Sequence, residues 1–142
     1  MLRLAETKDI PEIVELAVES LNQYPWPLQK NRRAIREIIE LSIGQECAWV
    51  SDQGKILGAV FGVVHPGVWF SENQVSLVMF YCPTGGEGYK LLRKFADFVK
   101  SRQDIGMAAV SLEEFHDDRY VRMFKRLGFT KPAPTFIYVR QK

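Results

Sequence analysis

The feature that most constrains the fold of this chain is a direct succession of strand, glycine turn and helix near its middle. An apolar run from Val75 to Cys82 ends at a proline, the next segment, 84–88, holds three glycines, and a helix pattern begins at Tyr89. Glycine lets the backbone curl so that N–H groups point inward, and a helix N-terminus adds partial positive charge. The succession therefore predicts an anion site, and the expected occupant is a phosphate-bearing ligand.

The glycine cluster has a plainer interpretation as an ordinary turn. Three glycines in four residues at a helix start favour a phosphate cradle over that plain turn. A Walker loop is excluded because no Gly-Lys-Ser/Thr sequence is present. A dinucleotide fingerprint is disfavoured because only Gly86-Glu87-Gly88 fits its spacing and no early βαβ unit precedes it.

Length and composition indicate one domain, residues 1–142, with room for a sizeable core. The net charge of +2 is too small to argue for nucleic-acid or membrane binding. The longest apolar run, 56–64, is too short to span a bilayer, and the N-terminus has no signal-peptide core. His65 and His116 have no metal-ligand spacing to each other or to the two cysteines. We therefore expect a soluble cytoplasmic protein that holds no metal.

Hydrophobic periodicity and turn signals predict the element order β-α-α-β-β-β-α-β-α-β, an α/β or α+β domain. The expected strands are 2–5, 47–51, 56–65, 75–82, 107–112 and 135–140. The expected helices run from an Asp9 cap to the break at 24–27, over 31–42, over 89–101, and from Asp117 or Asp118 to Leu127.

In this order of elements, two local signatures resemble the GNAT N-acetyltransferase superfamily. The segment 75–92 resembles the family's coenzyme A pyrophosphate-binding motif. The segment 117–129 resembles its late helix, in which an aromatic residue, here Phe124, is followed by three residues and Gly-Phe. The opening Leu2-Arg3-Leu4-Ala5, followed by Asp9-Ile10 and a helix, is also typical of the family. The resemblance covers nearly the whole chain.

The resemblance implies a single-domain GNAT-like α/β (α+β) fold with a mixed, mostly antiparallel twisted sheet flanked by about four helices. The sheet is expected to splay between the strand from Val75 to Cys82 and the strand from Met107 to Leu112. Acetyl-CoA is expected to enter that gap as cosubstrate. The residues implied in cofactor binding are Phe80, Tyr81, Cys82, Thr84, Gly85, Gly86, Glu87, Gly88, Tyr89, Lys90 and Phe124.

The chain departs from the family pattern at three places. Pro83 stands where the family loop usually has an arginine, so Lys90 or Arg93 is expected to supply positive charge. Phe124 stands where many members place a tyrosine that protonates the departing thiolate. The strand 75–82 lacks the glutamate that often serves as the base.

Replacement catalytic groups are therefore sought elsewhere in the sequence. An amine must be neutral to attack a thioester, and a lysine-like amine has a pKa of about 10.4, so a base or a water relay is required. Glu113 and Glu114 follow the strand that borders the expected gap and are the first candidates, although a solvated loop is the plainer interpretation of that acidic run. Tyr81 and Tyr120 are the candidate acids.

Aromatic residues in two loops are the candidates for binding the acceptor amine, because both loops are expected to reach the mouth of the gap. The candidate acceptor-binding residues are Tyr24, Trp26, Trp69 and Glu72, and His65 is a weaker candidate base. A tryptophan in such a loop is as often a packing anchor. The acceptor itself is left open among a protein N-terminus, a lysine, a polyamine, an aminoglycoside and a modified base.

The function that these patterns favour is transfer of an acetyl group from acetyl-CoA to a primary amine, by direct attack in a ternary complex. One alternative is a catalytically degenerate member that binds acyl-CoA or acts as an interaction module. A second is a nucleic-acid-associated protein, because basic residues gather at 30–36 and 119–126, although such runs are usually solvated faces. A homodimer is compatible with the resemblance, since many members are dimers.

Overall fold

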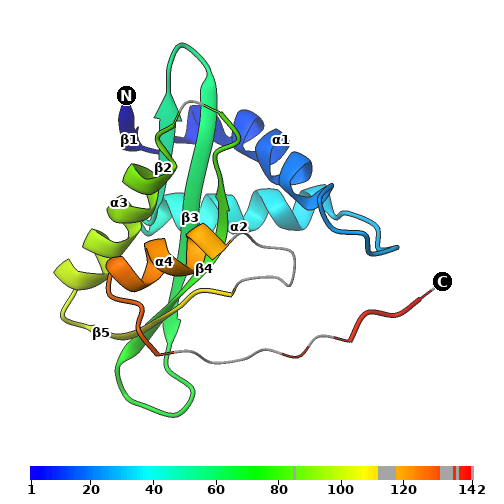
Figure 1. The fold of residues 1–142 in the computed structure, drawn as a ribbon. Helices are drawn as coiled ribbons and strands as arrows, with labels where there is room; N and C mark the ends of the chain where they lie inside the picture. The colour runs from blue at the N-terminus through cyan, green and yellow to red at the C-terminus, as the bar shows by residue number, and fades with distance from the viewer. Residues whose placement is uncertain (85, 112–117, 132–135, 137, 142) are drawn as a thin grey trace.

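The computed structural model describes residues 1–84, 86–111, 118–131, 136 and 138–141. Its elements, in chain order, are β1 (Leu2–Leu4), the 3-10 helix η1 (Thr7–Asp9), α1 (Ile10–Leu21), α2 (Arg32–Gly44), β2 (Ala48–Asp52), β3 (Ile56–Pro66), β4 (Asn73–Tyr81), α3 (Gly88–Ser101), β5 (Ile105–Ala109) and α4 (Asp118–Arg126) (Figure 1). Within the described ranges, no helix combines the length and apolar character needed to cross a membrane.

The strands form one mixed sheet in the order β1-β2-β3-β4-β5. Neighbours pair antiparallel except β4 and β5, which run parallel. The β4–β5 pairing covers only Asn73 to Ser76 of β4, so the second half of that strand pairs with β3 alone. The two strands diverge beyond this point (Figure 1). The expected splay is therefore confirmed, although β5 begins at Ile105 rather than at Met107.

A β-bulge in β4 lies at the point where the sheet opens. Phe61 pairs with Met79 and the adjacent Gly62 pairs with Leu77, so Val78 is an extra residue without a partner in the register. A bulge bends its strand and increases the local twist. This bend directs the rest of β4 away from β5.

The two faces of the sheet carry separate hydrophobic clusters. Helices α1 and α2 cover one face, where Ile13 and Ile39 are buried. Helices α3 and α4 cover the other, where Leu91, Phe95 and Phe124 are buried (Figure 1). The amphipathic stripes of these helices explain the arrangement, because each helix can bury its apolar side only against the sheet.

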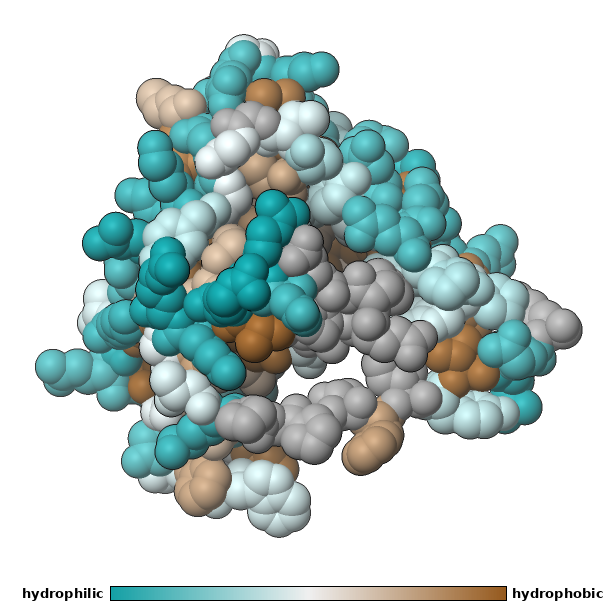
Figure 2. Space-filling model, viewed as in Figure 1, coloured by the Kyte–Doolittle hydropathy of each residue, from teal (hydrophilic) through white to brown (hydrophobic). Residues whose placement is uncertain are grey.

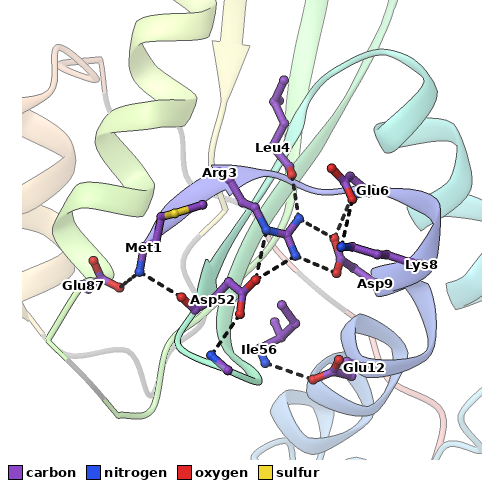
Figure 3. Close-up of polar contacts among 11 residues, drawn as sticks. Met1, Arg3, Leu4, Glu6, Lys8, Asp9, Glu12, Asp52, Ile56 and Glu87 are labelled. Atoms are coloured by element: carbon purple, nitrogen blue, oxygen red, sulfur yellow. Dashed lines mark hydrogen bonds and ion pairs between the residues drawn. The ribbon is translucent and has the colours of Figure 1, made fainter.

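A polar network fixes the start of the chain to the sheet and corrects one sequence expectation. Asp9 was expected to cap α1, but its carboxylate makes no capping bond to that helix. It accepts hydrogen bonds instead from the Arg3 guanidinium at 2.8 and 2.9 Å and from the Glu6 N–H at 2.8 Å (Figure 3). Arg3 also donates to Asp52 of β2 at 3.1 Å. A charged partner of opposite sign at short range outcompetes a helix cap.

The expected strand at 135–140 is not seen in the part of it that is described. Phe136 and 138–140 have no strand assignment, and the rest of that stretch lies outside the described residues. Phe136 is 94% exposed and Tyr138 is 78% exposed. Alternation of apolar and polar residues favours a strand only where a neighbouring strand supplies hydrogen-bond partners.

Candidate functional site

A cleft of about 580 Å³ lies where β4 and β5 part. Its lining comes from both sides of the sheet edge. Side chains that pack with the α1 and α2 cluster include Ala17, Ile35, Ile38, Phe61, Met79 and Tyr81. Side chains that pack with the α3 and α4 cluster include Leu77, Phe80, Cys82, Val110, Tyr120 and Phe124.

The bulge determines which residue of β4 faces which side. Before the bulge, Val75 and Leu77 pack with the α3 and α4 cluster. After it, Met79 and Tyr81 pack with the α1 and α2 cluster, whereas Phe80 returns to the other side. The two faces of β4 thus belong to two cleft walls of different composition.

Six residues expected at the site line the cleft. They are Tyr24, Phe80, Tyr81, Cys82, Tyr120 and Phe124. Pro83 lines the cleft just beyond the end of β4, whereas the described loop residues Thr84 and 86–90 that come after it do not. Gly85, Glu113 and Glu114 lie outside the described residues.

The described part of the glycine loop contains a residue in a conformation that favours glycine. Gly86 has a φ of +70°, in the left-handed region that favours glycine. Helix α3 begins at Gly88, two residues later. Helix N-termini leave their first N–H groups without intrahelical partners, so these groups are available to an anion at the end of the cleft.

Glu87 precedes α3 but makes no capping hydrogen bond to it. Its carboxylate accepts hydrogen bonds from Ser51 Oγ and from Gln53 Nε2, and it lies 3.8 Å from the Met1 amino group (Figure 3). The Ser51 hydrogen bond is the main reason why the pKa of Glu87 is lowered from its ordinary value. The negative charge is therefore held toward β2 and the chain start instead of over the helix N-terminus.

Gly88 connects the loop to the cleft wall by close packing. A Cβ atom at this position would lie 3.2 Å from the Phe80 ring. That separation is tighter than an ordinary van der Waals contact, so a larger residue at this position would require the Phe80 ring to shift by a few tenths of an ångström. Lys90 and Arg93 follow in the first turns of α3 and are exposed. Hydrophilic side chains cover this side of the molecule around α3 and α4 (Figure 2).

Two tyrosines line opposite sides of the cleft. The Tyr120 ring packs edge-on against Phe80, with 5.8 Å between ring centroids, and Phe124 lies one turn further along α4 and is 6% exposed. Tyr81 faces the α1 and α2 side. Burial raises the pKa of Tyr81 and the Glu19 charge adds to that rise, whereas a hydrogen bond with the Gln23 side chain opposes it.

The acceptor-binding expectations are met only in part. Tyr24 lines the cleft. Trp26 packs on the Tyr24 ring, with 4.8 Å between ring centroids, but does not line the cleft. Trp69, which is 85% exposed, and Glu72 lie between β3 and β4, where β4 begins, and they do not line the cleft. The expectation that their loop reaches the gap is wrong, because the sheet opens only beside the second half of β4.

Sequence reasoning missed the cleft wall formed by α1 and α2. Ser20, Gln23, Ile35 and Ile38 line the cleft, but the isoleucines had been assigned only to the apolar stripe of their helix. Ile39 of the same stripe is fully buried. Helical periodicity predicts which side of a helix is apolar, but not whether a neighbouring element covers that side completely.

Among the residues that the structure describes, no group of three His, Cys, Asp or Glu side chains is arranged to hold a metal ion. His65, the weaker candidate base, lies 3.0 Å from Ser76 Oγ through Nε2 and belongs to the paired part of β3 and β4. His65 therefore does not line the cleft.

No family model and no curated protein matches the sequence. Solved structures match the fold along the chain. A predicted acetyltransferase from Clostridium acetobutylicum, solved with acetyl-CoA, has a TM-score of 0.72 at 12% identity and covers 99% of this chain and 95% of its own. A ribosomal-protein-alanine N-acetyltransferase from Brucella melitensis biovar Abortus 2308 has a TM-score of 0.67 at 12% identity, covering 100% and 98%.

An aminoglycoside acetyltransferase from an uncultured soil metagenomic sample, in complex with sisomicin, has a TM-score of 0.66 at 14% identity and covers 100% of this chain and 96% of its own. Identities this low establish a shared fold and nothing finer. The chain therefore has the GNAT-like fold of acetyltransferases.

Proposed function

We propose that this protein is an acetyl-CoA-dependent N-acetyltransferase that transfers the acetyl group to a primary amine by direct attack in a ternary complex. The observation that carries the proposal is the cleft between β4 and β5, whose lining includes Pro83, shortly before the N-terminus of α3 in the chain. The solved structure with acetyl-CoA among the structural neighbours supports the choice of cosubstrate.

The cofactor would lie along the unpaired half of β4. The backbone groups of Phe80 and Cys82 face a gap that β5 has left, and an extended pantetheine arm would pair with them as an added strand does. The diphosphate would rest on N–H groups between Gly86 and Lys90, with Lys90 adding positive charge. Gly88 of this loop lies beside Phe80, which supports a position of the nucleotide on the α3 and α4 side of the sheet.

The bulge at Val78 lies directly before the backbone N–H groups that would contact the thioester. Backbone N–H groups near Phe80, directly after the bulge, would donate to the thioester carbonyl oxygen and stabilise the negative charge that develops on it during attack. Fixed donors of this kind cost no reorganisation in the transition state. The chain would therefore contribute positioning and electrostatic stabilisation, with no covalent acyl-enzyme.

The proposed mechanism needs an acid that protonates the departing thiolate and a base that removes a proton from the attacking amine. The amine nitrogen attacks the carbonyl carbon, the carbon–sulfur bond breaks, and the departing thiolate takes a proton. Tyr120 lies on the cofactor side of the cleft and is the proposed donor; Tyr81, on the opposite side, is the alternative. Glu113 or Glu114, directly or through water, is the proposed base that removes the ammonium proton.

The test is a comparison of binding with transfer. Purified protein would be titrated with acetyl-CoA by calorimetry and then incubated with labelled acetyl-CoA and a panel of amines. The proposal expects saturable binding and labelled amide products. Binding without transfer to any amine would instead favour the acyl-CoA-binding module, an alternative to which the phenylalanine at 124 gives weight. Absence of acetyl-CoA binding would exclude both.

A further inference from the structure

The α1 and α2 side of the cleft has a composition that restricts the acceptor. Its wall consists of Leu21, Ile35, Ile38 and Met79, with the Tyr24 ring at the same side. Ile35 and Ile38 are only half-buried, because they border open space. Among the residues that the structure describes, none that lines the cleft carries a charge.

The charged residues of α2 are directed away from this wall and paired with one another or with α1. Arg33 lies 3.1 Å from Glu37, and Arg36 lies 3.0 Å from Glu40. Such pairs occupy neighbouring turns on the outer side of a helix. They leave the apolar wall without a carboxylate from α2 that would receive a second or third ammonium group.

The polar side chains that line this side, among the described residues, are neutral and include Ser20, Gln23 and Tyr81. Gln23 and Tyr81 line the cleft, and the carboxylate of Glu19 lies close enough to Tyr81 to act on it electrostatically. One negative charge beside an otherwise neutral, apolar wall complements a ligand that has one ammonium group and an apolar body.

We infer that the acceptor is a primary amine with a single positive charge on an aromatic or aliphatic body, and that Leu21, Ile35 and Ile38 bind this body. The inference rests on the proposed transferase function and narrows it. A polyamine or an aminoglycoside would have to remove several ammonium groups from water without paired carboxylates on this wall, which is strongly unfavourable. Covering a phenyl-sized body favours the apolar amine by about tenfold to hundredfold in affinity.

The test compares 2-phenylethylamine with spermidine as acceptors, measuring coenzyme A release. We expect kcat/KM to be at least about tenfold higher for 2-phenylethylamine. Ile38→Asp should remove this preference, because it places a carboxylate in the wall, while acetyl-CoA affinity stays unchanged. Leu41→Asp is the matched control, since Leu41 lies on the same helix, is 49% exposed and does not line the cleft. Leu21→Asp is a second wall variant if Ile38→Asp fails to fold.

Direct binding measurements keep the inference separate from the proposed function. If acetyl-CoA does not bind, the proposed function fails, and the wall is still tested by titrating each amine into the protein. Tighter binding or faster turnover of spermidine would overturn the inference. It would also be overturned if Ile38→Asp weakened binding of octanoyl-CoA but not of 2-phenylethylamine, because the wall would then belong to the acyl donor.

Discussion

Replacing Gly86 by valine tests whether the glycine loop binds the cofactor. With a φ of +70° and open space around its Cβ position, Gly86 is constrained by backbone conformation and not by neighbouring atoms. A residue with a Cβ pays about 1–2 kcal/mol to adopt the left-handed conformation. A β-branched side chain is especially poor there, so the loop is expected to leave this conformation and lose the alignment of its N–H groups.

The expected binding loss follows from the hydrogen bonds at stake. A hydrogen bond to a charged group contributes about 1.5–3 kcal/mol, so losing one phosphate contact weakens acetyl-CoA binding by at least about tenfold. Calorimetric titration measures the affinity, and urea denaturation measures the free energy of unfolding of the same variant. Valine at Gly54 is the matched control, because Gly54 also has a positive φ, +90°, and open space around its Cβ position, but lies in the β2–β3 turn.

A specific result would refute this reasoning. If Gly86→Val is folded and binds acetyl-CoA as tightly as the unchanged protein, the loop does not hold the diphosphate. If Gly54→Val loses acetyl-CoA binding to the same extent, the effect of Gly86→Val is a general consequence of backbone strain and says nothing about the loop.

Three further outcomes are expected from other parts of the structure. Asp9→Asn should lower the free energy of unfolding by about 1.5–3 kcal/mol, because it removes a charge-assisted pair with the mostly buried Arg3 guanidinium, which keeps Asp52 as its second charged partner; urea denaturation measures this. The hydrogen bond from Arg3 is the main cause that lowers the pKa of Asp9 in the folded protein. The stability that this pair contributes is therefore present above the unfolded-state pKa of about 3.9 and is lost as the pH falls through the lower folded-state pKa. Urea titrations at a series of acid pH values should show this loss of stability, and the loss should be smaller in Asp9→Asn. Tyr120→Phe should lower kcat by about a hundredfold or more with unchanged acetyl-CoA affinity, whereas Tyr81→Phe should spare kcat; equal kcat values for Tyr120→Phe and the unchanged protein would remove Tyr120 as the acid.

Most of the order of the elements could be predicted from the sequence because local patterns encode it, whereas the opening of the sheet was implied only by the resemblance to the GNAT superfamily. The turn at 52–55, the glycine loop and the late helix each have residues with direct conformational consequences, and Gly54, Gly86 and Gly128 all have positive φ. The Asn31 cap of α2 is equally local, since its Oδ1 accepts from the Ala34 N–H at 3.0 Å.

The site was less predictable because it depends on contacts between distant segments. The sequence contains a pattern that is compatible with the bulge, because the strand 75–82 is apolar at both its odd and its even positions. The same pattern predicts a strand that is buried on two faces, and it does not distinguish the two cases. The partner position of the bulge also mattered, since a Cβ at Gly62 would lie 2.8 Å from the Ser76 carbonyl oxygen. Neither the failure of the loop carrying Trp69 to reach the cleft nor the role of Ile38 in its wall has a local signal.

The extra residue at Val78 changes the course of β4 without changing the sides on which the flanking side chains lie. In a chain lacking that residue, Leu77, Met79 and Phe80 would alternate without interruption and keep the sides that they have now. The strand would be straighter, and its outer edge would be able to form a continuous ladder with β5. Deleting a single amino acid would thus replace part of the gap with additional sheet, which under the proposed function would remove the place where acetyl-CoA binds.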